Sequence, residues 1–261
     1  MTLWEPIKLK CEMDYLWEIG SLKLWVKKTE IEWLVAYEHQ PGELYAGKQV
    51  AAQKVQKPED LVWNRFVYED PSCIIQLMPA LHDRAVVISS ETPIRMLPGN
   101  SALFFVSIPI WVRIYTGESK KAMLIEIPTI TLSNTWFGDP MNGELCYSLS
   151  THARRKVEDL EASPQRAVCP FYVRNKSTEQ LEFQMMAVHV EHLKIYKDSD
   201  RLWTNEVYIN FLSNDQLSQV NYSEKEPSII QGCELMAEER VPLDNSIIKK
   251  SIGFLRSFSN F

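Results

Sequence analysis

Alternating apolar and polar residues dominate this chain and predict β-strands. Between residues 104 and 114 every even position is apolar, whereas the odd positions include Ser107, Pro109 and Arg113. A repeat of two residues places the apolar side chains on one face of a strand. Because proline donates no hydrogen bond to a neighbouring strand, Pro109 indicates an edge or a bulge.

The same repeat predicts two hairpins. The apolar positions of residues 22–26 change phase before those of residues 31–37, across a polar break. Residues 193–195 and 203–211 flank a cluster of lysine, aspartate and serine in the same way. A phase change across turn-forming residues is typical of a β-hairpin.

Further strands and a few helices complete the predicted fold. The strands are expected at residues 62–68, 73–80, 84–90, 122–132, 144–149 and 169–174. A phase change near Met186 predicts a β-bulge. Two stretches have helical spacing, namely residues 151–161, capped by Thr151, and residues 247–258. Residues 39–60 hold few large apolar residues and predict a long loop.

The predicted fold class is mainly β, with one or two antiparallel β-sandwich or jelly-roll-like units and a few short helices. Residues 1–150 are expected to form an N-terminal β-sandwich domain. Residues 151–261 are expected to form a C-terminal β domain with a helical entry segment and a C-terminal helix. A single sandwich with an inserted helix is the alternative.

Charge and cysteine usage narrow the function classes. The 261 residues carry a net charge of −6, and no segment has a basic excess. Nucleic acid is therefore not an expected partner, because its binding needs a basic stripe that neutralises phosphates. The longest apolar stretch, residues 102–112, is too short to span a membrane. The five cysteines are odd in number and the first 24 residues lack a signal-like apolar run, so a cytoplasmic protein with reduced thiols is expected.

The turn around residues 136–144 carries the catalytic candidates. Asp139 and Glu144 lie there beside aromatic residues, and two such carboxylates can act as acid and base in glycoside chemistry. Together with Trp136 and Asn142, Asp139 also forms a candidate ligand loop. The alternative is a purely structural turn, since Asn, Asp and Gly are favoured in turns for conformational reasons.

A basic cluster at the start of the predicted helix is the anion-binding candidate. His152, Arg154, Arg155 and Lys156 precede acidic residues, which reverses the order that a helix dipole favours. A phosphate, sulfate or carboxylate bound at the helix start would account for this order. The alternative is a short solvated turn in which Arg154 pairs with Glu158.

No metal site and no cofactor are expected. His189 and His192 are three residues apart, which puts them on opposite faces of a strand, so they share a metal only if the local structure is helical. Glu191 shares a face with His189, but this gives only two ligands. The sequence shows no nucleotide-binding or hydrolase motif. The position of Cys146 beside a turn leaves open whether it is buried and inert or exposed and reactive.

Several segments together resemble a known family. These segments are Ile127–Asp139, Gly143–Tyr147, Cys169–Pro170, Val173–Ser177, Leu193–Tyr196 and Leu202–Thr204. As a set they are similar to a family of archaeal and bacterial proteins classed as a domain of unknown function, best over residues 76–211. The resemblance implies a stand-alone protein of the prokaryotic cytoplasm and no particular activity, substrate or catalytic residue.

These observations favour a non-catalytic binding or protein-interaction module whose partner is a protein or a small molecule. Binding on a sandwich needs only loops and sheet faces, whereas catalysis needs a constellation of residues that the sequence does not show. The first alternative is an enzyme that acts on a carbohydrate or a phosphate ester through Asp139 and Glu144. The second alternative is a homo-oligomeric structural protein.

Overall fold

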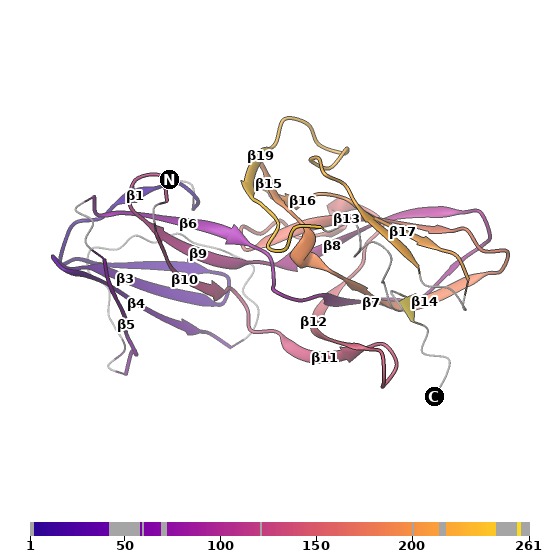
Figure 1. Cartoon of the computed structure of the whole chain (residues 1–261), viewed down its shortest axis with the longest axis horizontal. Coiled ribbons are helices and arrows are strands. Elements are labelled where there is room, and N and C mark those ends of the chain that lie inside the picture. Colours follow the sequence, from indigo (N-terminus) through magenta and orange to yellow (C-terminus); the bar gives the residue numbers. More distant parts are fainter. Residues whose placement is uncertain are drawn as a thin grey trace. The chain divides into compact units, whose positions relative to one another are not determined.

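The structure is a computed structural model of a mainly β protein, which confirms the predicted fold class (Figure 1). It describes residues 3–41, 58, 60–68, 72–120, 122–199, 201–213, 218–243 and 255–256. Two compact units divide the chain, each built from separated stretches of sequence. Unit 1 comprises residues 1–80, 109–131 and 163–165, and unit 2 comprises residues 81–108, 132–162 and 166–261. The domain boundary expected between residues 150 and 151 stays a prediction.

Unit 1 contains two four-stranded antiparallel sheets. The first is the meander β2 (Asp14–Ile19), β3 (Leu22–Lys28), β4 (Glu32–His39) and β5 (Asn64–Val67). The second has the order β1 (Ile7–Lys8), β6 (Ile74–Ala80), β9 (Trp111–Thr116) and β10 (Ala122–Pro128). The hairpin predicted from residues 22–26 and 31–37 is confirmed by the pairing of Val26 with Val35. Both sheets contribute buried apolar side chains, which include Trp17, Trp33, Leu77 and Ile114.

Unit 2 contains a five-stranded and a seven-stranded sheet. The five-stranded sheet has the order β11 (Ser133–Phe137), β12 (Glu144–His152), β7 (Val86–Met96), β14 (Leu181–Val188) and β20 (Leu255–Arg256). The seven-stranded sheet has the order β18 (Gln219–Tyr222), β17 (Val207–Phe211), β13 (Arg166–Asn175), β16 (Arg201–Thr204), β15 (Ile195–Asp198) and β19 (Glu234–Ala237), with β8 (Ser101–Pro109) beside β13. The pairs β12–β7, β13–β16 and β13–β17 are parallel, and the other pairings of these sheets that are described are antiparallel.

The predicted strand details are largely confirmed. The turn after Asp198 joins β15 to β16, as expected, but the second strand of that hairpin ends at Thr204 and resumes as β17. The register of β14 against β7 shifts between Phe183 and Met185, close to the bulge predicted at Met186. The apolar run over residues 104–114 is buried at every even position, yet it forms two strands that part at Ile110, directly after Pro109.

The prediction of a helix over residues 151–161 is wrong. Thr151 is still part of β12, and its Oγ1 donates a 2.9 Å hydrogen bond to the Ser107 carbonyl. Arg154 exchanges two backbone hydrogen bonds with Phe105 of β8. Because β8 satisfies these backbone groups, only a 3₁₀ turn, η1 (Val157–Asp159), remains of the helix.

The C-terminal helix expected over residues 247–258 lies mostly outside the described residues. The two described residues of that stretch form β20, which pairs with Met185 and Met186. The loop expected over residues 39–60 lies largely outside the described residues as well. Within the described part of the chain, no helix is long and apolar enough to cross a membrane.

Candidate functional site

A single 3₁₀ turn of unit 2 gathers two histidines and a glutamate. The turn η2 (Val190–His192) follows β14 directly, and His189 is its N-terminal cap. In a 3₁₀ turn, residues three apart lie on the same side, unlike residues three apart in a strand. One ligand atom from each of His189, Glu191 and His192 lies within 4.8 Å of the others. The premise that separated the two histidines therefore fails, because the local structure is helical.

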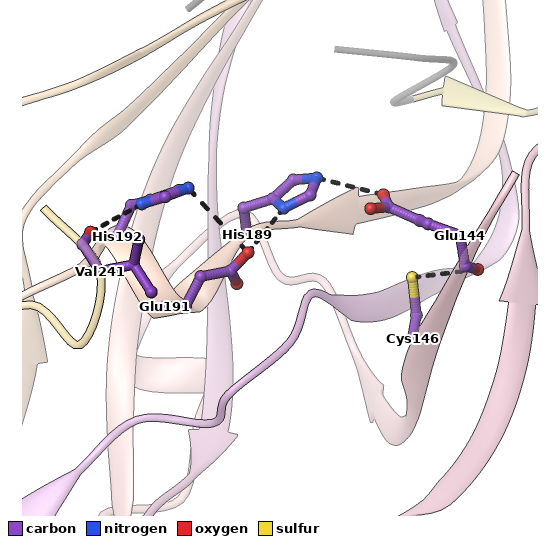
Figure 2. A network of polar contacts seen from close by, with 6 residues as sticks. All are labelled: Glu144, Cys146, His189, Glu191, His192 and Val241. Atoms are coloured by element: carbon purple, nitrogen blue, oxygen red, sulfur yellow. Dashed lines mark hydrogen bonds and ion pairs between the residues drawn. The ribbon is translucent and has the colours of Figure 1, made fainter. Parts of the chain in front are cut away.

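Glu144 joins the cluster from another strand, as the network in Figure 2 shows. Its Oε1 lies 3.1 Å from Nε2 of His189, while Nδ1 of the same ring lies 2.8 Å from Oε1 of Glu191. Both Tyr147 of β12 and Val188 of β14 are paired with Val86, the first residue of β7. Glu144 and His189 lie beyond these pairs, at the end of the sheet where β7 begins, and so can meet across it.

His192 is held by the chain near residue 241. Its Nδ1 lies 2.8 Å from the carbonyl oxygen of Val241, and the Val241 amide donates a 2.9 Å hydrogen bond to the Glu191 carbonyl. Since a carbonyl oxygen only accepts, Nδ1 of His192 carries a proton. The other ring nitrogen, Nε2, lies 4.0 Å from Oε1 of Glu191. Nε2 of His192 thus faces the same carboxylate that His189 contacts.

Charge holds the residues of this cluster together. Burial alone lowers the pKa of His189, but hydrogen bonds to Glu144 and Glu191 and the attraction of both carboxylates outweigh it and raise the pKa to about 10. His189 is therefore an imidazolium at neutral pH and donates to a carboxylate from each ring nitrogen. A cation at Nδ1 would take the place of this proton.

Glu191 carries an unsatisfied oxygen. Its side chain is 13% exposed, and Oε2 is buried with no hydrogen-bond partner among the described residues. Leaving a buried acceptor unpaired costs about 1–3 kcal/mol, and more when the group is charged. The other oxygen of this carboxylate, Oε1, lies 2.8 Å from Nδ1 of His189 and 4.0 Å from Nε2 of His192. A cation bound by the carboxylate would supply the interaction that Oε2 lacks.

A half-buried tyrosine and a buried cysteine lie near the cluster. The ring of Tyr222 meets that of His192 edge-on, with centroids 5.7 Å apart. Cys146 is fully buried, and burial, together with the negative charges of Glu144 and Glu191, raises the pKa of its thiol to about 12. The question that the sequence left open is thereby answered, because a buried thiol with this pKa is unreactive.

The chemistry of the cluster is that of a metal ligand set. Two imidazole nitrogens and one carboxylate bind Zn²⁺ and other first-row divalent ions, and leave coordination positions for water or a ligand. In such sites the second ring nitrogen of each histidine donates to a carboxylate or a backbone carbonyl, which fixes the ring. Glu144 and the Val241 carbonyl occupy these two outer positions here.

Asp139, the other catalytic candidate, serves its own turn. Its Oδ1 accepts 2.9 Å hydrogen bonds from the amides of Met141 and Asn142, and these bonds lower the pKa of the carboxyl. Trp136 donates a 3.1 Å hydrogen bond from Nε1 to the Asp139 carbonyl. The ligand-loop residues thus stabilise the turn between β11 and β12, and of the two carboxylates only Glu144 contacts the histidine cluster.

The structure does not bring the four basic candidates together at one site. His152 Nδ1 lies 3.1 Å from the Ser89 hydroxyl, and Arg154 forms a 2.9 Å ion pair with Glu91. The helix whose N-terminus would have bound the anion is absent. The anion hypothesis therefore loses the helix end on which it depended.

One basic candidate does line a cavity. Arg155 places its guanidinium 4.9 Å from the centre of the Phe104 ring, at the wall of a cavity of about 540 Å³. The cavity is also lined by Arg95, which forms a 2.8 Å ion pair with Glu182. Lys156 is exposed.

Sequence reasoning missed the gathering of His189, Glu191 and His192. The period-two pattern continues through Val188 and Val190, so it gives no sign that β14 ends between them. The available signal was the short spacing of His189, Glu191 and His192. This spacing indicates a shared site only if the three residues lie in a helical turn and not in a strand.

Comparisons with known proteins agree with the sequence resemblance. No curated protein and no solved structure matches the chain. A family model described as "Protein of unknown function (DUF432)" matches residues 3–256. Since this match covers nearly the whole sequence, the chain belongs to the DUF432 family of proteins of unknown function.

Proposed function

We propose that this chain is a non-catalytic binding protein whose ligand is a divalent transition-metal ion held by His189, Glu191 and His192. One observation carries the proposal. Each histidine has one ring nitrogen next to a fixed acceptor, while its other nitrogen faces the carboxylate of Glu191. This is the arrangement of ligands and outer hydrogen bonds found in histidine–carboxylate metal sites.

Zinc is the ion that the donor set favours. Imidazole suits zinc, copper, iron and nickel, whereas calcium and magnesium prefer sites made of oxygen alone. Three protein ligands fill three of the four positions of tetrahedral zinc coordination and leave one position for an exogenous ligand. The proposal departs from the sequence-based expectation of no metal, because that expectation assumed an extended strand at His189.

Calorimetric titration of the metal-free full chain with ZnCl₂ tests the proposal. We expect one zinc ion per chain, and an affinity lowered about 100-fold or more in His192→Gln. His152→Gln is the matched control, because that histidine contacts Ser89 and lies outside the cluster. The absence of zinc binding, or equal binding by the parent chain and His192→Gln at matched folding by circular dichroism, would contradict the proposal.

An enzyme acting on a carbohydrate or a phosphate ester is the second candidate. Three protein ligands leave a position for a metal-bound water, which favours hydrolytic chemistry, and Glu144 contacts the cluster. The engagement of Asp139 in its own turn speaks against the acid–base pair expected from the sequence. Hydrolysis of p-nitrophenyl phosphate or glycosides by the zinc-loaded chain, lost in Glu191→Gln, would favour the enzyme.

Anion binding at Arg155 is a separate part of the proposal. The cavity that Arg155 lines has a volume suited to a small molecule and combines polar and apolar walls. Titration with inorganic phosphate should raise the thermal unfolding midpoint of the parent chain and of Lys156→Glu, but not of Arg155→Glu. Equal responses of the two variants would exclude this site.

Three expectations about setting and assembly also remain proposals. A cytoplasmic, prokaryotic setting is consistent with a slightly acidic chain without a basic excess, and cell fractionation tests it. Self-association is tested by light scattering, in which a monomer would exclude the homo-oligomer. Binding to nucleic acid is not expected, and a gel-shift assay with duplex DNA and RNA should show none.

A further inference from the structure

Two thiols of unit 1 lie next to one another. Sγ of Cys11 lies 3.3 Å from Sγ of Cys73, although 62 positions of sequence separate the residues. The sulfur atoms of a disulfide are about 2.05 Å apart, so the two must approach by little more than about 1 Å to bond. All five cysteines of the chain are free thiols in this structure.

The fold holds this pair in place. Lys8 of β1 pairs with Ile74 of β6, and the Leu9 amide donates a 2.8 Å hydrogen bond to the Cys73 carbonyl. Cys11 thus follows a strand that is fixed beside Cys73. Its own turn is fixed by a 2.7 Å hydrogen bond from the Glu12 amide to the Lys28 carbonyl. The closeness of the sulfurs therefore follows from backbone pairing on both sides.

Exposure gives the two thiols different roles. Cys11 is exposed and is reached first by a reagent in solution, whereas Cys73 is half-buried behind it. Burial, reinforced by the hydrogen bond to Cys11, raises the pKa of the Cys73 thiol. A less accessible thiol with a raised pKa is suited to a second, intramolecular step, in which closeness compensates for low reactivity.

We infer that Cys11 and Cys73 form a thiol–disulfide exchange site whose oxidant is a small-molecule disulfide. The Cys11 thiolate attacks one sulfur of the oxidant, which forms a mixed disulfide and releases one small thiolate. The Cys73 thiolate then attacks the Cys11 sulfur and releases the second small thiolate. The protein pair loses two electrons and two protons, and the oxidant takes them up as two thiols. The inference is independent of the metal proposal, because it concerns other residues and another chemistry.

Incubation of the reduced full chain with glutathione disulfide tests the inference. After gel filtration, we expect an intact mass lower by two hydrogen atoms, and a peptide map that links Cys11 to Cys73. Cys73→Ser lacks the second thiol, so it should stop at the mixed disulfide, with one glutathione attached to Cys11. Cys233→Ser, which removes another partly exposed cysteine, should oxidise like the parent chain.

Two results would overturn the inference. One is a parent chain that stays unmodified or stops at the mixed disulfide, as the Cys73→Ser variant does. The other is an intramolecular disulfide that links either residue to a different cysteine. Because Cys11 is exposed and its replacement by serine removes no buried group, Cys11→Ser serves as a folded reference that should form no internal disulfide.

Discussion

Nε2 of His189 lies 3.1 Å from Oε1 of Glu144, and this contact joins the end of β14 to the start of β12. The two strands are not neighbours, since β7 runs between them. The contact exists because both residues extend past Val86, where β7 begins. One end of the five-stranded sheet thus orients the ring of a histidine whose other nitrogen faces Glu191. The same contact would hold the ring in place around a metal ion.

The turn that carries Glu144 depends on Gly143. A Cβ atom at Gly143 would lie 2.4 Å from Nε1 of Trp136 and 2.7 Å from the Phe137 carbonyl oxygen. Since one of these atoms belongs to the backbone, the hairpin must distort to accept it. We expect Gly143→Ala to lower the free energy of unfolding by about 2–3 kcal/mol in urea denaturation. Gly99→Ala is the control, because its Cβ would meet open space and only the positive φ of 74° would cost stability. A smaller loss for Gly143→Ala than for the control would contradict the packing argument.

His82 gives the protein a defined sensitivity to acid. The ring is 1% exposed, and burial lowers its pKa to about 3, with the nearby Arg240 lowering it further and Asp83 opposing the shift. The unfolded chain binds this proton near pH 6.5, whereas the folded chain binds it only near pH 3. Stability from this group is therefore present above pH 6.5 and is lost as the pH falls toward 3.

We expect His82→Phe to reduce the pH dependence of unfolding between pH 6.5 and 3, measured by urea denaturation across that range. The phenylalanine keeps the ring packed near Tyr147 and has no proton to bind. His152→Phe is the matched histidine control and should leave the steep acid dependence in place. An unchanged slope in His82→Phe would show that the histidine ring is solvated in the folded state.

Arg166 ties together three strands of unit 2. Its guanidinium donates to the hydroxyl and the carbonyl of Ser107 on β8, at 2.7 and 2.6 Å, and to the Thr151 hydroxyl on β12 at 3.3 Å. Burial lowers its pKa to about 10, so it remains charged at neutral pH. Lysine cannot reproduce this planar fork. Arg166→Lys should cost about 2–3 kcal/mol in urea denaturation, whereas Arg201→Lys, at a partly exposed position, should cost less than about 0.5 kcal/mol. Equal losses would show that the buried fork adds no stability.

Much of the fold could be predicted because apolar and polar residues alternate along the strands, and this alternation shows which side chains are buried. The even positions from Phe104 to Ile114 are buried as expected, and Trp33 and Trp203, which lie in the apolar runs of the two predicted hairpins, are buried as well. Helices were harder to predict. Residues 151–161 have helical spacing, but Thr151 and Arg154 form hydrogen bonds with β8 instead. Local propensity is a weak guide where a neighbouring strand competes for the same backbone groups.

The candidate site was harder still to predict. Glu144 was singled out as a carboxylate beside a turn, but its partner in the structure is His189, 45 positions later, and not Asp139. The assignment of His189 and His192 to opposite faces followed from continuing the strand pattern past Val188. The change to a 3₁₀ turn at Val190 leaves no mark in the hydrophobic pattern, so only the structure brings the ligand atoms together.

Zinc K-edge X-ray absorption on the full chain loaded with one equivalent of zinc is the most direct test of the metal site. The account predicts a first shell of nitrogen and oxygen at about 2.0–2.1 Å, with outer-shell scattering from two imidazoles. The imidazole scattering should fall by half in His192→Gln, which removes one histidine ligand. It should stay unchanged in Glu191→Gln, which removes none. A sulfur shell at about 2.3 Å, or zinc that washes off before measurement, would contradict the assignment of His189, Glu191 and His192 as the ligands.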